Sequence, residues 1–194
     1  NPNLFLVARQ NARENEALFR AAKLDTVVDS AAIMANGILA LISTPLLKDF
    51  LRLARGHSSD WATRLLERLT PLLNGETPQL WTARLTPQEA PAVSGALSRG
   101  ELKIGHLFAD PGERDRRLPW LPLLLVRGDV EQLLPPDDIV LAPGDAILCC
   151  GRWDTFHRMG WLLTDPNVLH YVLTGDTRPQ GSVWRWLAAR RAIV

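Results

Sequence analysis

The sequence predicts an α/β protein with a partial Rossmann-like βαβ unit, a helical crossover hairpin, a small α+β lobe and a helical C-terminal extension. Three features indicate this class. A continuous apolar run of strand length occupies residues 4–8, helical periodicity extends through residues 30–73, and short apolar strands separated by turns follow Asn74. We therefore divide the chain into residues 1–29, 30–75, 76–151 and 152–194.

Composition excludes several classes of protein. The 194 residues include 22 Lys and Arg against 21 Asp and Glu, and 46% are hydrophobic, so the chain lacks the composition of a disordered protein and the basic excess of a nucleic-acid binder. The two cysteines are adjacent and cannot form a disulfide framework, which indicates a reducing compartment. The longest apolar stretch, residues 31–47, is shorter than the ~20 residues of a spanning helix, and no signal peptide is expected.

The first part is predicted to be a strand at residues 4–8, a helix at 11–22 and a second strand at 25–29. Two strands cannot bury both of their faces, and the chain starts at Asn1 without Met, so we expect a piece of a longer protein. Arg9 follows the first strand, at the edge where open α/β sheets bind ligands, and is the candidate nucleotide-phosphate residue. The alternative is a solvated arginine, which is favoured because no glycine-rich loop completes the site.

The second part is predicted to be two apolar helices, at residues 30–53 and 58–73. Ser30 is a candidate N-cap, and Pro45 should bend or split the first helix near Ser43 and Thr44. The apolar stripes are wide for helices between two small lobes, so we interpret them as a dimerisation or crossover element. The candidate interface residues are Leu39, Ile42, Leu46, Leu47, Phe50 and Leu51.

The third part is predicted to be a small lobe of short strands. The expected strands are at residues 79–85, 101–107, 121–127, 139–141 and 146–150. Residues 143–145 are expected to form a tight turn, in which Asp145 has a turn role in preference to a ligand-binding role. In the last part we expect a helix at 154–163 capped by Asp154, and helical structure again from Ser182.

No catalytic or metal-binding motif is apparent. The four histidines are scattered among different elements, no paired metal-ligand pattern occurs, and no glycine-rich phosphate loop follows a strand. Cys149 and Cys150 are neighbours in a predicted strand and face opposite sides, so at least one should be a buried apolar residue. We therefore expect no enzymatic activity, no catalytic residue and no metal site.

Two groups of motifs resemble the RCK domain (regulator of potassium conductance, with lobes called TrkA-N and TrkA-C). Residues 1–53 resemble the second half of TrkA-N through the runs NPNLFLVAR, ENEALF and LDTVV, although Lys23-Leu24-Asp25 departs from the family's Gly-Ala-Asp. Residues 79–151 resemble TrkA-C through LKIGHL, LLLVR and the closing hairpin LAPGDAILCCG. Together these two segments cover about two thirds of the chain.

The resemblance implies a cytosolic ligand-sensing, dimerising domain of a prokaryotic potassium channel or uptake system, at the cytoplasmic face of the inner membrane. It implies a homodimer and a transmembrane pore or transporter subunit as partners, and no nucleic acid. NAD(H) or an adenine nucleotide would be the ligand of the intact protein, and no cofactor is expected in this chain, because the glycine fingerprint is missing. The alternatives are a fragment of an NAD-dependent oxidoreductase and a purely structural assembly module.

Overall fold

The computed structural model describes residues 7–10, 21–22, 26–29, 35, 38–39 and 41–176. It divides into two compact units, Asn1–Lys48 and Asp49–Val194, which are described separately. The predicted α/β class is confirmed, because parallel strands, helices and an antiparallel sheet all occur in the described residues.

The first unit contains a pair of parallel strands. β1 (Val7–Gln10) pairs with β2 (Thr26–Asp29), and Val7 is aligned with Thr26. This confirms the predicted parallel arrangement. Most of the helix expected at residues 11–22 lies outside the described residues. Ser30, the predicted N-cap of the following helix, lies outside them as well.

The chain is helical at residues 41–43, leaves the helix at Thr44 and enters α3 (Pro45–Ala54). Pro45 is the first residue of α3, a position that needs no N–H donor, and it disfavours helical geometry in the residue before it. The predicted break at Thr44 is therefore confirmed. The Thr44 carbonyl oxygen accepts a hydrogen bond from the N–H of Leu47 at 2.9 Å, which starts the new helix.

α4 (Ser59–Leu73) begins and ends at local sequence signals. The Ser58 hydroxyl accepts a hydrogen bond from the N–H of Trp61 at 3.4 Å, and Asn74 ends the helix in the left-handed conformation with φ of 49°. The Trp61 ring lies 4.8 Å from the His57 ring and 6.4 Å from the Phe50 ring, measured between ring centroids. These contacts connect α4 to the end of α3 and to the turn between the two helices.

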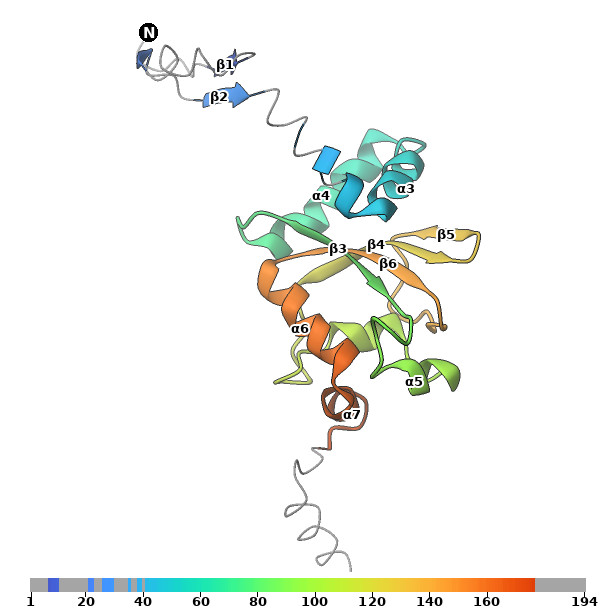
Figure 1. Cartoon of the computed structure of the whole chain (residues 1–194). Helices are drawn as coiled ribbons and strands as arrows, with labels where there is room; N and C mark the ends of the chain where they lie inside the picture. Colours follow the sequence, from blue (N-terminus) through green and yellow to red (C-terminus); the bar gives the residue numbers. More distant parts are fainter. Residues whose placement is uncertain are drawn as a thin grey trace, which may run out of the picture. The chain divides into compact units, whose positions relative to one another are not determined.

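The second unit is built on a four-stranded antiparallel sheet (Figure 1). Its strands, in the spatial order β3-β6-β4-β5, are β3 (Gln79–Arg84), β6 (Ala146–Gly151), β4 (Trp120–Arg127) and β5 (Val130–Leu133). Trp81 pairs with Cys149, and Leu121 pairs with Cys150, so the two adjacent cysteines face opposite sides of the sheet. Both are buried, as the sequence predicted for at least one of them.

Helices cover both faces of this sheet. In Figure 1, α3 and α4 lie above the sheet, and α6 (Trp153–Thr164) crosses below it together with α5 (Ser94–Ser98) and α7 (Pro166–Thr174). All six residues of β6 and the first six of β4 are therefore buried. The largest core lies on the α6 side and includes the following fully buried side chains: Leu85, Val93, Leu102, Ile104, Leu107, Trp120, Ile147, Met159 and Leu162.

Two predicted strands are absent from the structure. Residues 101–107 contribute only a bridge between Lys103 and Val140, and the chain then forms a 3₁₀-helix, η2 (Ile104–Phe108). Residues 139–141 form no strand. They are held in place by a hydrogen bond from the N–H of Ile104 to the Ile139 carbonyl at 3.0 Å. The apolar residues of η2 bury themselves in the core without joining the sheet.

Other differences concern helix ends and short elements. Arg152, not Asp154, occupies the N-cap position of α6, so the predicted cap was wrong and Asp154 lies in the first turn. The short elements α5, β5 and α7 were not predicted. The helix expected from Ser182 lies outside the described residues.

Candidate functional site

The predicted nucleotide-phosphate residue lies on the first pair of strands. Arg9 belongs to β1, is aligned with Val28 of β2, and has an exposed side chain. Its role in binding a nucleotide stays a prediction.

The predicted interface residues separate into two groups. Leu39, Ile42 and Leu51 have exposed fractions of 63%, 71% and 39%. Leu46 and Phe50 are buried, with exposed fractions of 8% and 7%, and a sixth residue is half-buried: Leu47. The dimer interface stays a prediction, and the exposed residues are the ones that remain available to a partner.

The carboxylate of Asp145 belongs to the turn before β6. Arg127 donates from Nε to Oδ1 at 2.8 Å and from Nη2 to Oδ2 at 2.7 Å, and the N–H of Ala142 donates to Oδ2 at 2.8 Å. The hydrogen bonds to this carboxylate raise the pKa of Arg127 above its ordinary value. Because both oxygens of the fully buried Asp145 are occupied by the protein, the structure supports the turn role.

The histidine of η2 has a structural hydrogen bond. His106 accepts the N–H of Lys103 through Nδ1 at 3.1 Å, which requires an unprotonated nitrogen. Burial lowers the pKa of His106, and the positive charges of Lys103 and Arg114 lower it further. The two thiols respond to burial in the opposite sense, because burial raises the pKa of Cys150 to about 11 and raises the pKa of Cys149 well above its usual value.

A cavity of about 460 Å³ opens beside α4, and we call it the α4 cavity. It is lined by Arg68, Leu72, Phe108, Arg117, Leu118, Pro119, Trp120, Leu121 and Asp137. These residues come from α4, from the end of η2, from the start of β4 and from two loops.

The charged groups of the α4 cavity are unequally paired. Arg117 donates to Asp137 at 2.8 Å, and its guanidinium carbon lies 4.1 Å from the centroid of the Phe108 ring. Arg68 is exposed and has no hydrogen bond or ion pair with any residue that the structure describes. The cavity therefore presents one paired and one unpaired guanidinium above an apolar wall.

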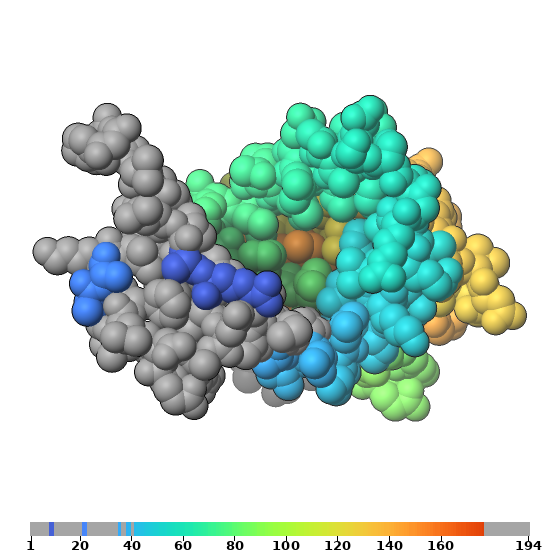
Figure 2. Space-filling model, turned by 90° about the horizontal axis from the view of Figure 1, so that it is seen from above, coloured from blue at the N-terminus to red at the C-terminus, as the bar shows by residue number. Residues whose placement is uncertain are grey.

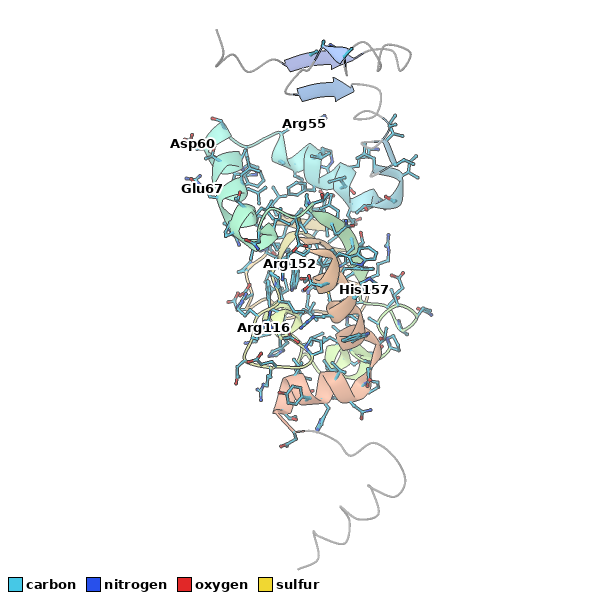
Figure 3. The ribbon with its side chains drawn as sticks, turned by 90° about the vertical axis from the view of Figure 1, so that its left-hand side faces the viewer. Arg55, Asp60, Glu67, Arg116, Arg152 and His157 are labelled. Atoms are coloured by element: carbon cyan, nitrogen blue, oxygen red, sulfur yellow. The ribbon has the colours of Figure 1, made fainter. Side chains whose placement is uncertain are left out.

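A second unusual surface is the outer face of α6. Trp153 and Trp161 have exposed fractions of 58% and 59%, and Phe156 is 36% exposed. The Trp153 and His157 rings lie 4.6 Å apart, and Figure 3 labels His157 on this helix. A smaller hollow of about 170 Å³ adjoins this face between α6 and β3. The sequence shows the helical spacing of these aromatic residues. It does not show which face of α6 packs against the core, so their exposure could not be predicted.

The described residues hold neither a membrane-spanning helix nor a metal-binding cluster. No helix in this part of the chain is long and apolar enough to cross a membrane. Within the same residues, no group of three His, Cys, Asp or Glu side chains is arranged to hold a metal ion.

The chain is similar to solved structures at low sequence identity. No family model and no curated protein sequence matches the chain. Among solved structures, the GsuK RCK domain is similar to 79% of this chain at 21% identity, with a TM-score of 0.29. The GsuK channel bound to NAD is similar to 84% of this chain at 18% identity, also with a TM-score of 0.29. The chain spans 26% and 22% of the lengths of these two neighbours.

Proposed function

We propose that the chain is a regulatory, non-enzymatic domain of a potassium channel or potassium uptake system, and that it forms a dimer whose arrangement changes when a ligand binds. The observation that supports this proposal most directly is the fold of the motif at residues 141–151. Gly144 adopts a φ of +87°, which favours glycine, and the next residue, Asp145, is fully buried. The Gly-Asp pair of the RCK-like hairpin thus has a structural reason to be present.

The order of the elements gives further support. A parallel strand pair, helices on either side of Thr44, α4 and an antiparallel sheet follow one another as the RCK-like motifs do along the sequence. In such a domain a ligand changes the state of the channel only through its difference in affinity for two arrangements of the domain. The exposed residues Leu39 and Ile42 would contribute to the surface that associates.

Light scattering of the purified chain tests the association. We expect a dimer, and we expect the Ile42→Glu variant to be monomeric, because a carboxylate would lose its water in an apolar interface. Val130→Glu is the matched control, since Val130 is 68% exposed on the β4–β5 hairpin and lies outside the predicted interface. A wild-type chain that is monomeric under all conditions would refute the dimer.

Ligand dependence needs a separate measurement. The same experiment is repeated with NAD(H), adenine nucleotides and divalent cations, and NAD is an apt first choice because the GsuK channel structure contains it. A change in mass or in dissociation constant supports a sensing role for this chain. A dimer whose mass and dissociation constant do not change with any of these ligands would instead support the alternative of a purely structural assembly module.

A further inference from the structure

The α4 cavity has the composition of a small-molecule site. Its volume of about 460 Å³ lies within the range of roughly 300–1,000 Å³ that ligand pockets occupy. Most of its lining is apolar, from Leu72, Leu118, Pro119 and Leu121, while its charged groups are few. Apolar walls with a small number of fixed polar groups are typical of sites that bind organic ligands.

The charges of the α4 cavity favour an anion. Two guanidinium groups, of Arg68 and Arg117, and one carboxylate, of Asp137, line it. Asp137 is already engaged by Arg117 at 2.8 Å, whereas Arg68 has no partner among the residues that the structure describes. A ligand carboxylate would therefore find an unpaired guanidinium, which binds carboxylates through parallel hydrogen bonds.

One buried donor in the lining is also unsatisfied. The indole Nε1 of Trp120 is shielded from solvent and has no hydrogen-bond partner among the described residues, although Trp120 is only 1% exposed. Buried donors of this kind are normally paired by protein, water or ligand. The neighbouring Phe108 ring stacks on Trp120 with centroids 4.3 Å apart, and the Arg117 guanidinium lies over the same Phe108 ring, so these three side chains form one packed group in the lining.

We propose that the α4 cavity binds a small organic anion that has an apolar body and one carboxylate group. The apolar body lies against the wall formed by Leu118, Pro119 and Leu72, and the carboxylate accepts hydrogen bonds from Arg68. Arg117 contributes at the edge of the site, in competition with its bond to Asp137. The lining of the α4 cavity includes neither Arg9 nor any of the predicted interface residues, and the proposal does not depend on dimerisation.

The test uses a pair of probes that differ only in the charged group. Calorimetric titration of the chain with indole-3-acetate is compared with titration by indole-3-ethanol, a neutral alcohol with the same ring system. We expect saturable binding of the acid and about tenfold weaker binding of the alcohol, because a charge-assisted hydrogen bond is lost. Equal affinity for both probes, or no saturable binding of the acid, would overturn the proposal.

Variants then locate the binding site. Arg68→Gln should weaken binding of indole-3-acetate about tenfold, whereas Arg64→Gln, one turn earlier on α4 and also exposed, should leave the affinity unchanged. Both variants remove one positive charge from the same helix, so a general electrostatic effect would weaken them equally, and that result would refute the site. Unchanged thermal unfolding of both variants shows that the fold is intact.

A second variant gives an effect of opposite sign. Asp137→Asn removes the carboxylate that competes for Arg117 and should tighten binding of indole-3-acetate about threefold, the size of an exposed ion pair. Weaker binding in this variant would show that Arg117 does not serve the ligand. Because affinity and molecular mass are measured separately, failure of this site and failure of the proposed dimer give different results.

Discussion

The ion pair between Arg127 and Asp145 allows a quantitative test of what holds the sheet together. The Asp145 side chain is completely buried, while the Arg127 side chain is 46% exposed, so the two partners are not equivalent. Replacing Arg127 by Met keeps most of the alkyl chain but leaves a buried carboxylate without its cation. Breaking a buried pair in this way lowers the free energy of unfolding by about 3–5 kcal/mol. Because Arg127 is partly exposed, we expect a loss of about 3 kcal/mol.

Substitution of the other partner, Asp145, should reduce the free energy of unfolding by less. Asp145→Asn keeps an oxygen that can accept from the N–H of Ala142, and the half-exposed guanidinium of Arg127 can be solvated by water. We expect a loss of about 1.5 kcal/mol, close to that of a hydrogen bond to a charged group. The double variant should then lose less than the sum of the two single losses, with a coupling of about 1–2 kcal/mol, because the residues touch.

Urea unfolding followed by tryptophan fluorescence measures these losses. All 7 tryptophans follow residue 48, so the signal reports on the unit Asp49–Val194. Arg84→Met is the control, since Arg84 forms an exposed ion pair with Glu89 at 3.9 Å. This substitution should change stability by about 0–1 kcal/mol. Equal losses for Arg127→Met and Arg84→Met, or strictly additive losses in the double variant, would refute the reasoning.

Three further predictions follow from single residues. Burial and nearby positive charges lower the pKa of folded His106, so the unfolded chain binds more protons than the folded chain below about pH 6.5, and stability should fall as the pH drops through this region. In His106→Asn the side-chain oxygen can still accept the hydrogen bond from Lys103, and the fall in stability should be smaller in urea titrations at about pH 5 and 8. Gly151→Ala should destabilise the chain by about 1–3 kcal/mol, since the new methyl group would meet backbone and side-chain atoms at 2.8–2.9 Å. Gly160→Ala, in open space within α6, should instead stabilise the chain by about 0.5–1 kcal/mol. Thermal unfolding measures both changes, and equal effects would contradict the packing. Buried Cys149 and Cys150 should react with a disulfide reagent at pH 8 only in denaturant, because their raised pKa values suppress the thiolate, and labelling of the native chain within minutes would refute this.

Sequence patterns predicted the elements whose signals are local. Pro45 separates α3 from the preceding helical turn, α4 begins within one residue of the predicted start at residue 58, and Gly144 permits the turn before β6. Each of these effects depends on the backbone of a few neighbouring residues, so the sequence carries it without knowledge of the fold. The parallel pairing of β1 and β2 was predicted in the same way, from the helical sequence pattern of the residues between them.

Short apolar runs were ambiguous for a physical reason. In η2 the buried residues are Ile104, Leu107 and Phe108, a spacing that suits a helical turn. A five-residue segment with flanking glycine and charged residues also fits a buried strand, and only the hydrogen bonds to the 137–139 segment decide between the two. The sequence could not supply these bonds, because the donor and acceptor segments are about thirty residues apart.

The α4 cavity could not be predicted from the sequence. Arg68, Arg117 and Asp137 belong to separate segments, and each looks like an ordinary surface charge in its own surroundings. The sheet brings these segments together, because β4 starts beside the loop that holds Arg117 and lies against α4. The aromatic residues of α6 differ in this respect, since their helical spacing was present and only the identity of the core face was missing.

The burial of β4 and β6 changes how the apolar helices before the sheet should be tested. A sheet whose central strands are buried on both faces needs a cover on each, and α4 supplies one cover with Leu65 inside (Figure 2 shows α3 in cyan and α4 in teal on this surface). Part of the wide apolar stripe is thus used within the chain, and a charge at Phe50 or Leu46 would damage folding before it reported on a dimer. Ile42, at 71% exposure, is where a charge can separate association from folding.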